Sequence, residues 1–216
     1  MATVKINYFI QGVAMSILTT EPDGQFSSHF EDPACFGNLK GTVYNHLINM
    51  NPLFEKDVIY ICIGTDRATG DCLGPMVGTR LQSTSLHPHV YGTLEQPVHA
   101  TNLAQVMQQI AERYKSPLTV AIDASLGNSS RIGFINVRKG GLKPGTALNK
   151  DLPEVGDFHI SGVVNVGGYL EQMVLQNTRL FLVYRMAEII ARGILVAHLN
   201  FESYKNREDD LYKSVN

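Results

Sequence analysis

The chain contains 216 residues, of which 44% are hydrophobic and 18% charged, and its formal net charge at pH 7 is −2. This composition is typical of a folded globular protein, and the length suits one domain with a full hydrophobic core. No strongly basic stretch appears, which argues against nucleic acid as a partner. The three cysteines, Cys35, Cys62 and Cys72, include no CxxC pair. They therefore argue against a disulfide framework or a structural zinc finger and favour a reducing compartment.

Residues 1–37 are interpreted as an N-terminal arm and loop. Residues 6–18 are mostly apolar but are interrupted by Asn7 and Gln11, are too few to span a bilayer and lack a clear cleavage site for a signal peptide. We therefore expect a strand or packing arm here, a cytoplasmic protein and no membrane partner. Residues 21–30 are polar and rich in turn-forming residues, which predicts a loop.

Residues 38–205 are expected to form a single α/β domain. Asn38 is a favourable cap for a helix over residues 39–50, which the Asn51-Pro52 pair then ends. Residues 58–63 form an unbroken apolar run rich in β-branched side chains, which predicts a strand covered on both faces.

The loop after this strand is the leading site candidate. It carries Asp66, Arg67 and Asp71 within six positions, just before a helix that begins near residues 73–75. In an open α/β sheet, ligands bind in the crevice beyond the carboxyl ends of the strands. Gly70, Gly74 and Gly78 recur at a spacing of four, which predicts a close approach between this helix and a strand.

The rest of the chain alternates between further strands and helices. Strands are predicted over residues 90–94, 118–122 and 132–137. Helices are predicted over residues 102–115, 169–175 and 178–198, and residues 139–145 are expected to form a loop. This alternation predicts a three-layer α/β/α sandwich. Residues 206–216 are interpreted as a charged tail that frays.

Asp71 and Asp123 are the strongest candidates for chemistry, because each follows a predicted buried strand. If those strands are neighbours, both carboxylates face one crevice. They would then share a proton as an acid and a base, or attract a cation. Two structural alternatives remain open: Asp71 as the N-cap of the following helix, and Asp123 as a turn residue that binds the backbone at Ala124.

Other polar residues have weaker claims. Asp66 and Arg67 form a local ion pair or position a substrate. His159, in an apolar context, is either a structural residue or a third ligand that would complete a site of zinc type with the two aspartates. Cys72 is disfavoured as a nucleophile, since the neighbouring Asp71 carboxylate opposes the thiolate.

Three motifs resemble those of the YyaC-type sporulation proteins, relatives of the spore germination protease and of the hydrogenase maturation proteases. They are GTDRATGDCLGP at residues 64–75, AIDASLG at 121–127 and HISGVVNVGG at 159–168. The resemblance covers residues 38–199 and implies a phosphorylase/hydrolase-like α/β/α fold. It also implies catalytic roles for Asp71 and Asp123. His159 is the best match for a metal-binding histidine, and the metal implied is of zinc or nickel type.

The resulting hypothesis is an endopeptidase-like hydrolase that acts on a protein or peptide substrate, with homo-oligomer formation left open. Asp71 and Asp123 would activate water, as a shared-proton pair or through a divalent ion. One alternative is a non-catalytic module that binds a metal or a peptide on a protease-derived scaffold. Another is a nucleotide- or phosphate-binding domain, which Asp66 and Asp71 disfavour because they would repel an anion.

Overall fold

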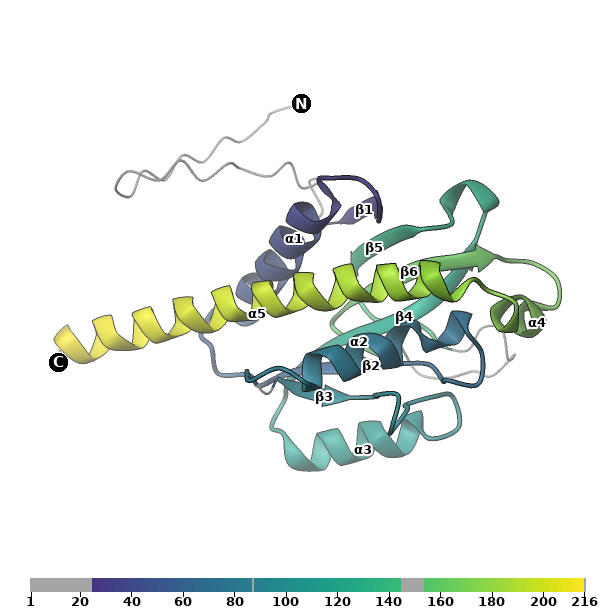
Figure 1. The fold of residues 1–216 in the computed structure, drawn as a ribbon. Helices are drawn as coiled ribbons and strands as arrows, with labels where there is room; N and C mark the ends of the chain where they lie inside the picture. The colour runs from purple at the N-terminus through teal and green to yellow at the C-terminus, as the bar shows by residue number, and fades with distance from the viewer. Residues whose placement is uncertain (1–24, 87, 145–153, 216) are drawn as a thin grey trace.

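The computed structural model describes residues 25–86, 88–144 and 154–215. The arm expected at residues 6–18 lies outside these ranges. The described chain forms one mixed sheet in the order β1-β5-β6-β4-β2-β3, with helices on both of its faces (Figure 1). The strands are β1 (Phe26–His29), β2 (Val58–Cys62), β3 (His89–Tyr91), β4 (Leu118–Gly127), β5 (Phe134–Lys139) and β6 (Phe158–Val166).

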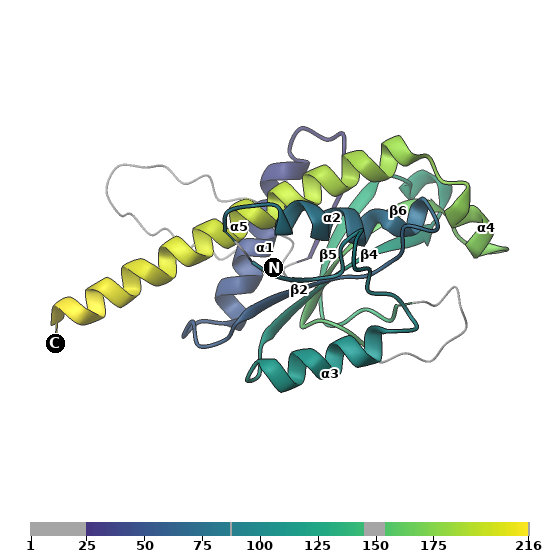
Figure 2. The ribbon, with the colours of Figure 1, turned by 60° about the horizontal axis from the view of Figure 1, so that its bottom comes forward.

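Strands β3, β2, β4 and β6 run parallel, whereas β5 and β1 are antiparallel to their neighbours. The helices are α1 (Cys35–Met50), α2 (Leu73–Gln82), α3 (Leu103–Arg113), α4 (Glu171–Gln176) and α5 (Leu180–Val215). Helices α1, α2 and α5 cover one face of the sheet and α3 covers the other, while α4 lies at one end (Figures 1 and 2). The predicted three-layer α/β/α sandwich is confirmed.

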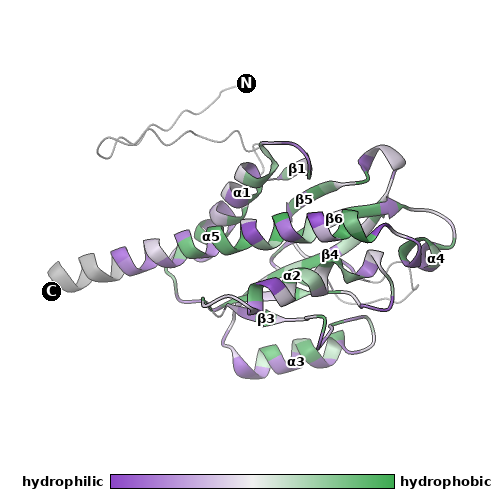
Figure 3. Cartoon of the chain, in the orientation of Figure 1, coloured by the Kyte–Doolittle hydropathy of each residue, from purple (hydrophilic) through white to green (hydrophobic). Residues whose placement is uncertain are grey.

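Strand β2 shows how the sequence pattern produces these layers. Val58, Tyr60 and Cys62 pack into the core beneath α1, α2 and α5. Ile59 and Ile61 pack into the second core beneath α3. Successive side chains of a strand point to opposite faces, so a continuous apolar run is needed to fill both cores. Along α3 and α5, by contrast, hydrophobic and hydrophilic colours alternate (Figure 3).

The prediction of a loop over residues 21–30 is wrong at β1, which is an edge strand paired with β5. Phe26 and Ser28 are its inward-facing, buried residues. Because the second of these is a serine, the apolar alternation that marks a half-buried strand is missing from the sequence. Helix α1 likewise begins at Cys35, before the cap expected at Asn38.

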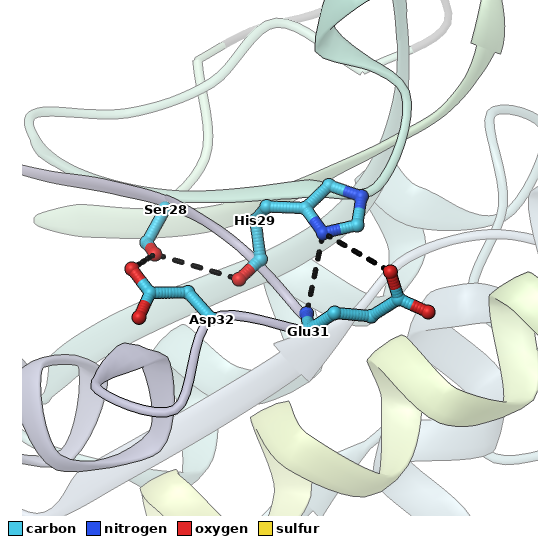
Figure 4. A network of polar contacts seen from close by, with 4 residues as sticks. All are labelled: Ser28, His29, Glu31 and Asp32. Atoms are coloured by element: carbon cyan, nitrogen blue, oxygen red, sulfur yellow. Dashed lines mark hydrogen bonds and ion pairs between the residues drawn. The ribbon is translucent and has the colours of Figure 1, made fainter.

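Polar contacts between β1 and α1 account for this early start (Figure 4). Ser28 Oγ donates to Asp32 Oδ2 at 2.9 Å, and the backbone N–H of Ala34 donates to Asp32 Oδ1 at 2.9 Å. Both bonds lower the pKa of Asp32, and the bond from Ala34 has the larger effect. His29 Nδ1 accepts the backbone N–H of Glu31 and lies 3.8 Å from its carboxylate. The carboxylate of Asp32 thus accepts hydrogen bonds from the strand and from the backbone just before α1 begins.

Helix α5 continues to Val215, so the prediction of a frayed tail over residues 206–216 is wrong for residues 206–215. The end of this helix projects beyond the sheet (Figure 1). Residues 202–213 are mostly of types with high or intermediate helix propensity, so the sequence allows α5 to continue to Val215. Within the described ranges, no helix is both long and apolar enough to cross a membrane.

A buried hydrogen bond joins β2 to α5: the Tyr60 hydroxyl lies 3.1 Å from His198 Nδ1. Burial lowers the pKa of His198, so the neutral ring is the form that the core favours. Replacing Tyr60 with Phe leaves the ring nitrogen without this partner. We expect a loss of about 1–3 kcal/mol in the free energy of unfolding, measurable by urea denaturation. Unchanged stability would contradict a structural role for the bond.

Candidate active site

Asp71 lies in a short 3₁₀ helix, Gly70–Cys72, between the end of β2 and the start of α2. The backbone N–H of Thr65 donates to the Asp71 carbonyl oxygen at 3.1 Å, which folds the loop back on itself. Cys72 is the N-cap residue of α2, and no side chain caps this helix end. The alternative role of Asp71 as an N-cap is therefore not seen, and its carboxylate is left for other contacts.

Asp123 lies within β4, which continues to Gly127 rather than ending at residue 122 as predicted. Strand β4 pairs with β2 only as far as Ile122, which is opposite Cys62. Beyond that point β4 pairs only with β6, where Asp123 is opposite Ser161. Asp123 is thus the first residue of β4 beyond its pairing with β2. On the side where β2 has ended, Asp123 faces the crevice. Its Oδ1 accepts the backbone N–H of Ala124 at 2.8 Å, the local bond expected of the alternative role.

Two adjoining cavities at this edge of the sheet share Asp71 and Asp123 as wall residues. The larger has a volume of about 380 Å³ and the smaller about 280 Å³. Besides the aspartates, the larger cavity is lined among others by Thr65, Arg67, His99, Gln172 and Leu175. Helix α4 thus forms one wall, and the structure brings the two carboxylates into one crevice.

The environment raises the pKa of both carboxyl groups. Burial raises the pKa of Asp71, while the backbone N–H of Thr65 and the charge of His99 lower it in part. Burial also raises the pKa of Asp123 well above its usual value, and the neighbouring Asp71 charge raises it further. The Ala124 N–H opposes this shift. Because two adjacent carboxylates resist double ionisation, the pair favours a state with one proton.

The three-ligand metal site suggested for Asp71, Asp123 and His159 is not formed. In the described parts of the chain, no three His, Cys, Asp or Glu side chains are placed to hold one metal ion. His159 lines the smaller cavity, but it is paired with Ala121, two positions before Asp123 along β4. Its Nδ1 lies 2.8 Å from the Gly140 carbonyl oxygen, a structural contact.

Asp66 and Arg67 are both exposed. Arg67 lines the larger cavity, and its backbone N–H donates to Thr65 Oγ1 at 3.3 Å. Among the ion pairs of the described residues, none joins Asp66 to Arg67, so the expectation of a local ion pair is wrong. A positioning role for either residue stays a prediction.

His99 is a site residue that sequence reasoning missed. It follows Val98, which forms a parallel bridge with Ile63 just beyond β2. This bridge places the His99 ring on the wall of the larger cavity, where Thr101 Oγ1 lies 2.8 Å from its Nδ1. The sequence carried no clear signal for this position, since Glu95, Gln96 and Pro97 directly precede Val98 and no apolar run marks it as a strand residue. Cys72 is unsuited to be a nucleophile, because burial raises the pKa of its thiol.

Comparisons with known proteins agree with the motifs noted in the sequence. A family model described as "Protein of unknown function (DUF1256)" matches residues 27–193. The chain belongs to this family. It is also 51% identical over 140 residues to the uncharacterized protein YyaC of Bacillus subtilis (strain 168), a match that covers 64% of this chain and 68% of YyaC.

Among solved structures, the fold of this DUF1256 protein is similar to that of the [NiFe] hydrogenase maturation protease HycI from Thermococcus kodakarensis KOD1. The TM-score is 0.41 at 17% sequence identity, and the superposition covers 68% of this chain and 98% of HycI. At this level the similarity concerns the α/β architecture alone. The chemistry of the site has to be argued from its own residues.

Proposed function

We propose that this protein is a hydrolase of peptide bonds whose reacting groups are Asp71 and Asp123. The observation that carries the proposal is the pairing of these two carboxyl groups in one crevice, at the carboxyl edge of adjacent parallel strands. The charge of Asp71 raises the pKa of Asp123, which is the electrostatic signature of such a pair.

The environments of the two residues suggest which one holds the proton. The pKa of Asp123 is raised well above its usual value, whereas that of Asp71 is raised and then partly lowered by Thr65 and His99. Asp123 is therefore the protonated partner and Asp71 the ionised one. In this scheme Asp71 takes a proton from water as the water oxygen attacks the peptide carbonyl carbon. Asp123 gives its proton to the carbonyl oxygen.

The second half of the reaction uses the same two groups in reverse. The tetrahedral intermediate collapses, the C–N bond breaks, and the leaving amine takes the proton that Asp71 accepted. The intermediate's hydroxyl proton returns to Asp123, which restores the starting state. His99, on the same wall, contributes positive charge when it is protonated, and this charge favours the ionised form of Asp71.

A metal of zinc or nickel type, as the family resemblance implies, does not fit the side chains that the structure describes. Catalytic zinc sites use three protein ligands and one open position. The described residues offer no such group of three, and His159 Nδ1 contacts a backbone carbonyl instead. The scheme above therefore contains no step through a metal.

The decisive test is cleavage of a mixed peptide library, read by mass spectrometry, by the wild type and by Asp71→Asn and Asp123→Asn variants. Removing either group is expected to lower the cleavage rate by about 10²–10⁴-fold, the usual contribution of a general acid or base. Each protein is also assayed with a chelator and with added divalent ions. Cleavage that survives chelation supports the carboxylate pair.

Three outcomes would contradict this proposal. Full turnover by both Asn variants would exclude the pair, and loss of activity on chelation that a divalent ion restores would favour a metal mechanism. Binding of peptides without any cleavage by the wild type would instead identify a non-catalytic peptide-binding module.

A further inference from the structure

A third and larger cavity lies beside the acidic crevice, between β3 and α3. Its volume is about 640 Å³. Its wall contains several neutral amide side chains, among them those of Gln82, Gln96, Gln105 and Gln109. Each amide offers both donors and an acceptor, so together they suit a ligand that presents alternating N–H and C=O groups. An extended polypeptide backbone is such a ligand.

One wall of this cavity is the edge of the sheet. Strand β3 is the last strand in the sheet order and pairs with β2 on one side only. No strand within the described ranges pairs with its other side. An edge strand presents unpaired backbone N–H and C=O groups, and an extended segment of another chain can add to it as a further strand. Pro88, Val90 and Tyr91 of this segment line the cavity.

The cavity adjoins the crevice that holds Asp71 and Asp123, and the two meet at His99. This residue lines both cavities, whereas Asp71 and Asp123 line only the crevice. Along this edge of the sheet, Tyr91 of β3 is opposite Ile61, and Val98 is opposite Ile63. The edge therefore continues from β3 toward the carboxyl ends of the parallel strands. A peptide that follows this edge therefore arrives at the two carboxylates.

We propose that β3 and α3 form the substrate-binding groove of this protein, and that an extended peptide segment of the substrate pairs with the free edge of β3. The segment passes over His99 and presents its scissile bond to Asp71 and Asp123. Arg113, at the end of α3, is a positively charged wall residue and favours an acidic side chain on the bound segment. This inference rests on the proposed hydrolase function and adds that the substrate binds as an extended peptide.

The groove is tested by binding rather than by turnover. Immobilised full-length Asp71→Asn protein is incubated with a pool of random decapeptides carrying blocked ends, and enriched peptides are identified by mass spectrometry. The Gln109→Arg substitution, introduced in the same background, places a long charged side chain in the groove. We expect its bulk to weaken binding at least tenfold, measured on enriched peptides that lack acidic side chains so that the added positive charge does not itself attract the ligand. Gln108→Arg is the matched control, since Gln108 is an exposed neighbour on α3 that does not line the cavity.

A scan with backbone N-methylation of the best peptide distinguishes strand pairing from recognition of side chains. In a strand, alternate residues direct their N–H groups to the same neighbour. Within the short stretch of peptide that lies opposite His89–Tyr91, methylation should therefore abolish binding where the N–H faces β3 and be tolerated at the adjacent positions. Loss without this alternation, or equal affinity of the Gln109→Arg and Gln108→Arg variants, would overturn the proposal. Failure to enrich any peptide would overturn it as well.

The two proposals fail in different ways. Peptides that show the alternating pattern but are never cleaved by the wild type contradict the hydrolase and leave the groove intact. Cleavage that requires both aspartates but is unaffected by Gln109→Arg supports the hydrolase and places its substrate elsewhere.

Discussion

Replacing Asp123 with Asn is expected to lower the rate of peptide cleavage by about 10²–10⁴-fold and, at neutral pH, to make the protein more stable. The folded state raises the pKa of Asp123 because the group is buried next to Asp71. At neutral pH the fold must keep Asp123 protonated or hold it ionised in an unfavourable site, and this costs up to about 1.4 kcal/mol for each unit of raised pKa. Asn removes this charge and keeps an oxygen that can accept the Ala124 N–H. Each kcal/mol gained corresponds to an increase in Tm of about 2–4 °C for a chain of this size.

The pH dependence gives this prediction a definite sign. A carboxyl group with a raised folded pKa binds more protons in the folded state than in the unfolded state. The wild type therefore loses stability as pH rises from the unfolded value of about 3.9 through the raised pKa. The Asp123→Asn variant does not show this loss of stability, because its amide does not titrate. The difference in Tm between variant and wild type should be small near pH 4 and grow toward pH 7.

Thermal unfolding of both proteins across this pH range is the measurement. Asp57→Asn is the matched control, since Asp57 is exposed, and its free energy of unfolding is expected to change by no more than about 0.5 kcal/mol. A lower Tm for Asp123→Asn at neutral pH would show that the carboxylate stabilises the fold, and the proposed shared proton would be wrong.

The second large effect is expected for Gly74→Ala. Gly74 lies in the first turn of α2, where the helix meets the end of β2. A Cβ at this position would be 2.1 Å from the backbone carbonyl oxygen of Ile63. Backbone cannot rotate away as a side chain can, so α2 would have to move. We expect a loss at or above the upper end of the usual range for overpacking, about 3 kcal/mol, and a decrease in Tm of roughly 6–12 °C.

Gly37→Ala is the matched control for this substitution. Gly37 also lies in a helix, but a Cβ there would have no atom within 4 Å. Alanine has a higher helix propensity by about 1 kcal/mol, so this variant should be slightly more stable than the wild type. Equal Tm values for the two alanine variants would contradict the close contact between α2 and β2.

The spacing of glycines along α2 was a reliable guide to packing. A Cβ at Gly78, one turn after Gly74, would lie 1.9 Å from the Gly92 carbonyl oxygen. The predicted close approach of helix and strand is therefore confirmed for Gly74 and Gly78, whereas Gly70 lies before α2 and faces Leu175 and Thr178. The apolar run of β2 was equally informative, because a strand that feeds two cores needs hydrophobic side chains in both directions.

The sequence by itself determined the α/β/α class, the strand and helix that flank the site loop, and the two aspartates as candidates. Each of these depends on periodicity or on the order of residues within one element. Only the tertiary structure decided that β1 is a strand, that β4 extends past β2, and that His99 rather than His159 shares the larger cavity with both aspartates. These features depend on strand order and register, which are set by pairing between segments that are distant in the chain.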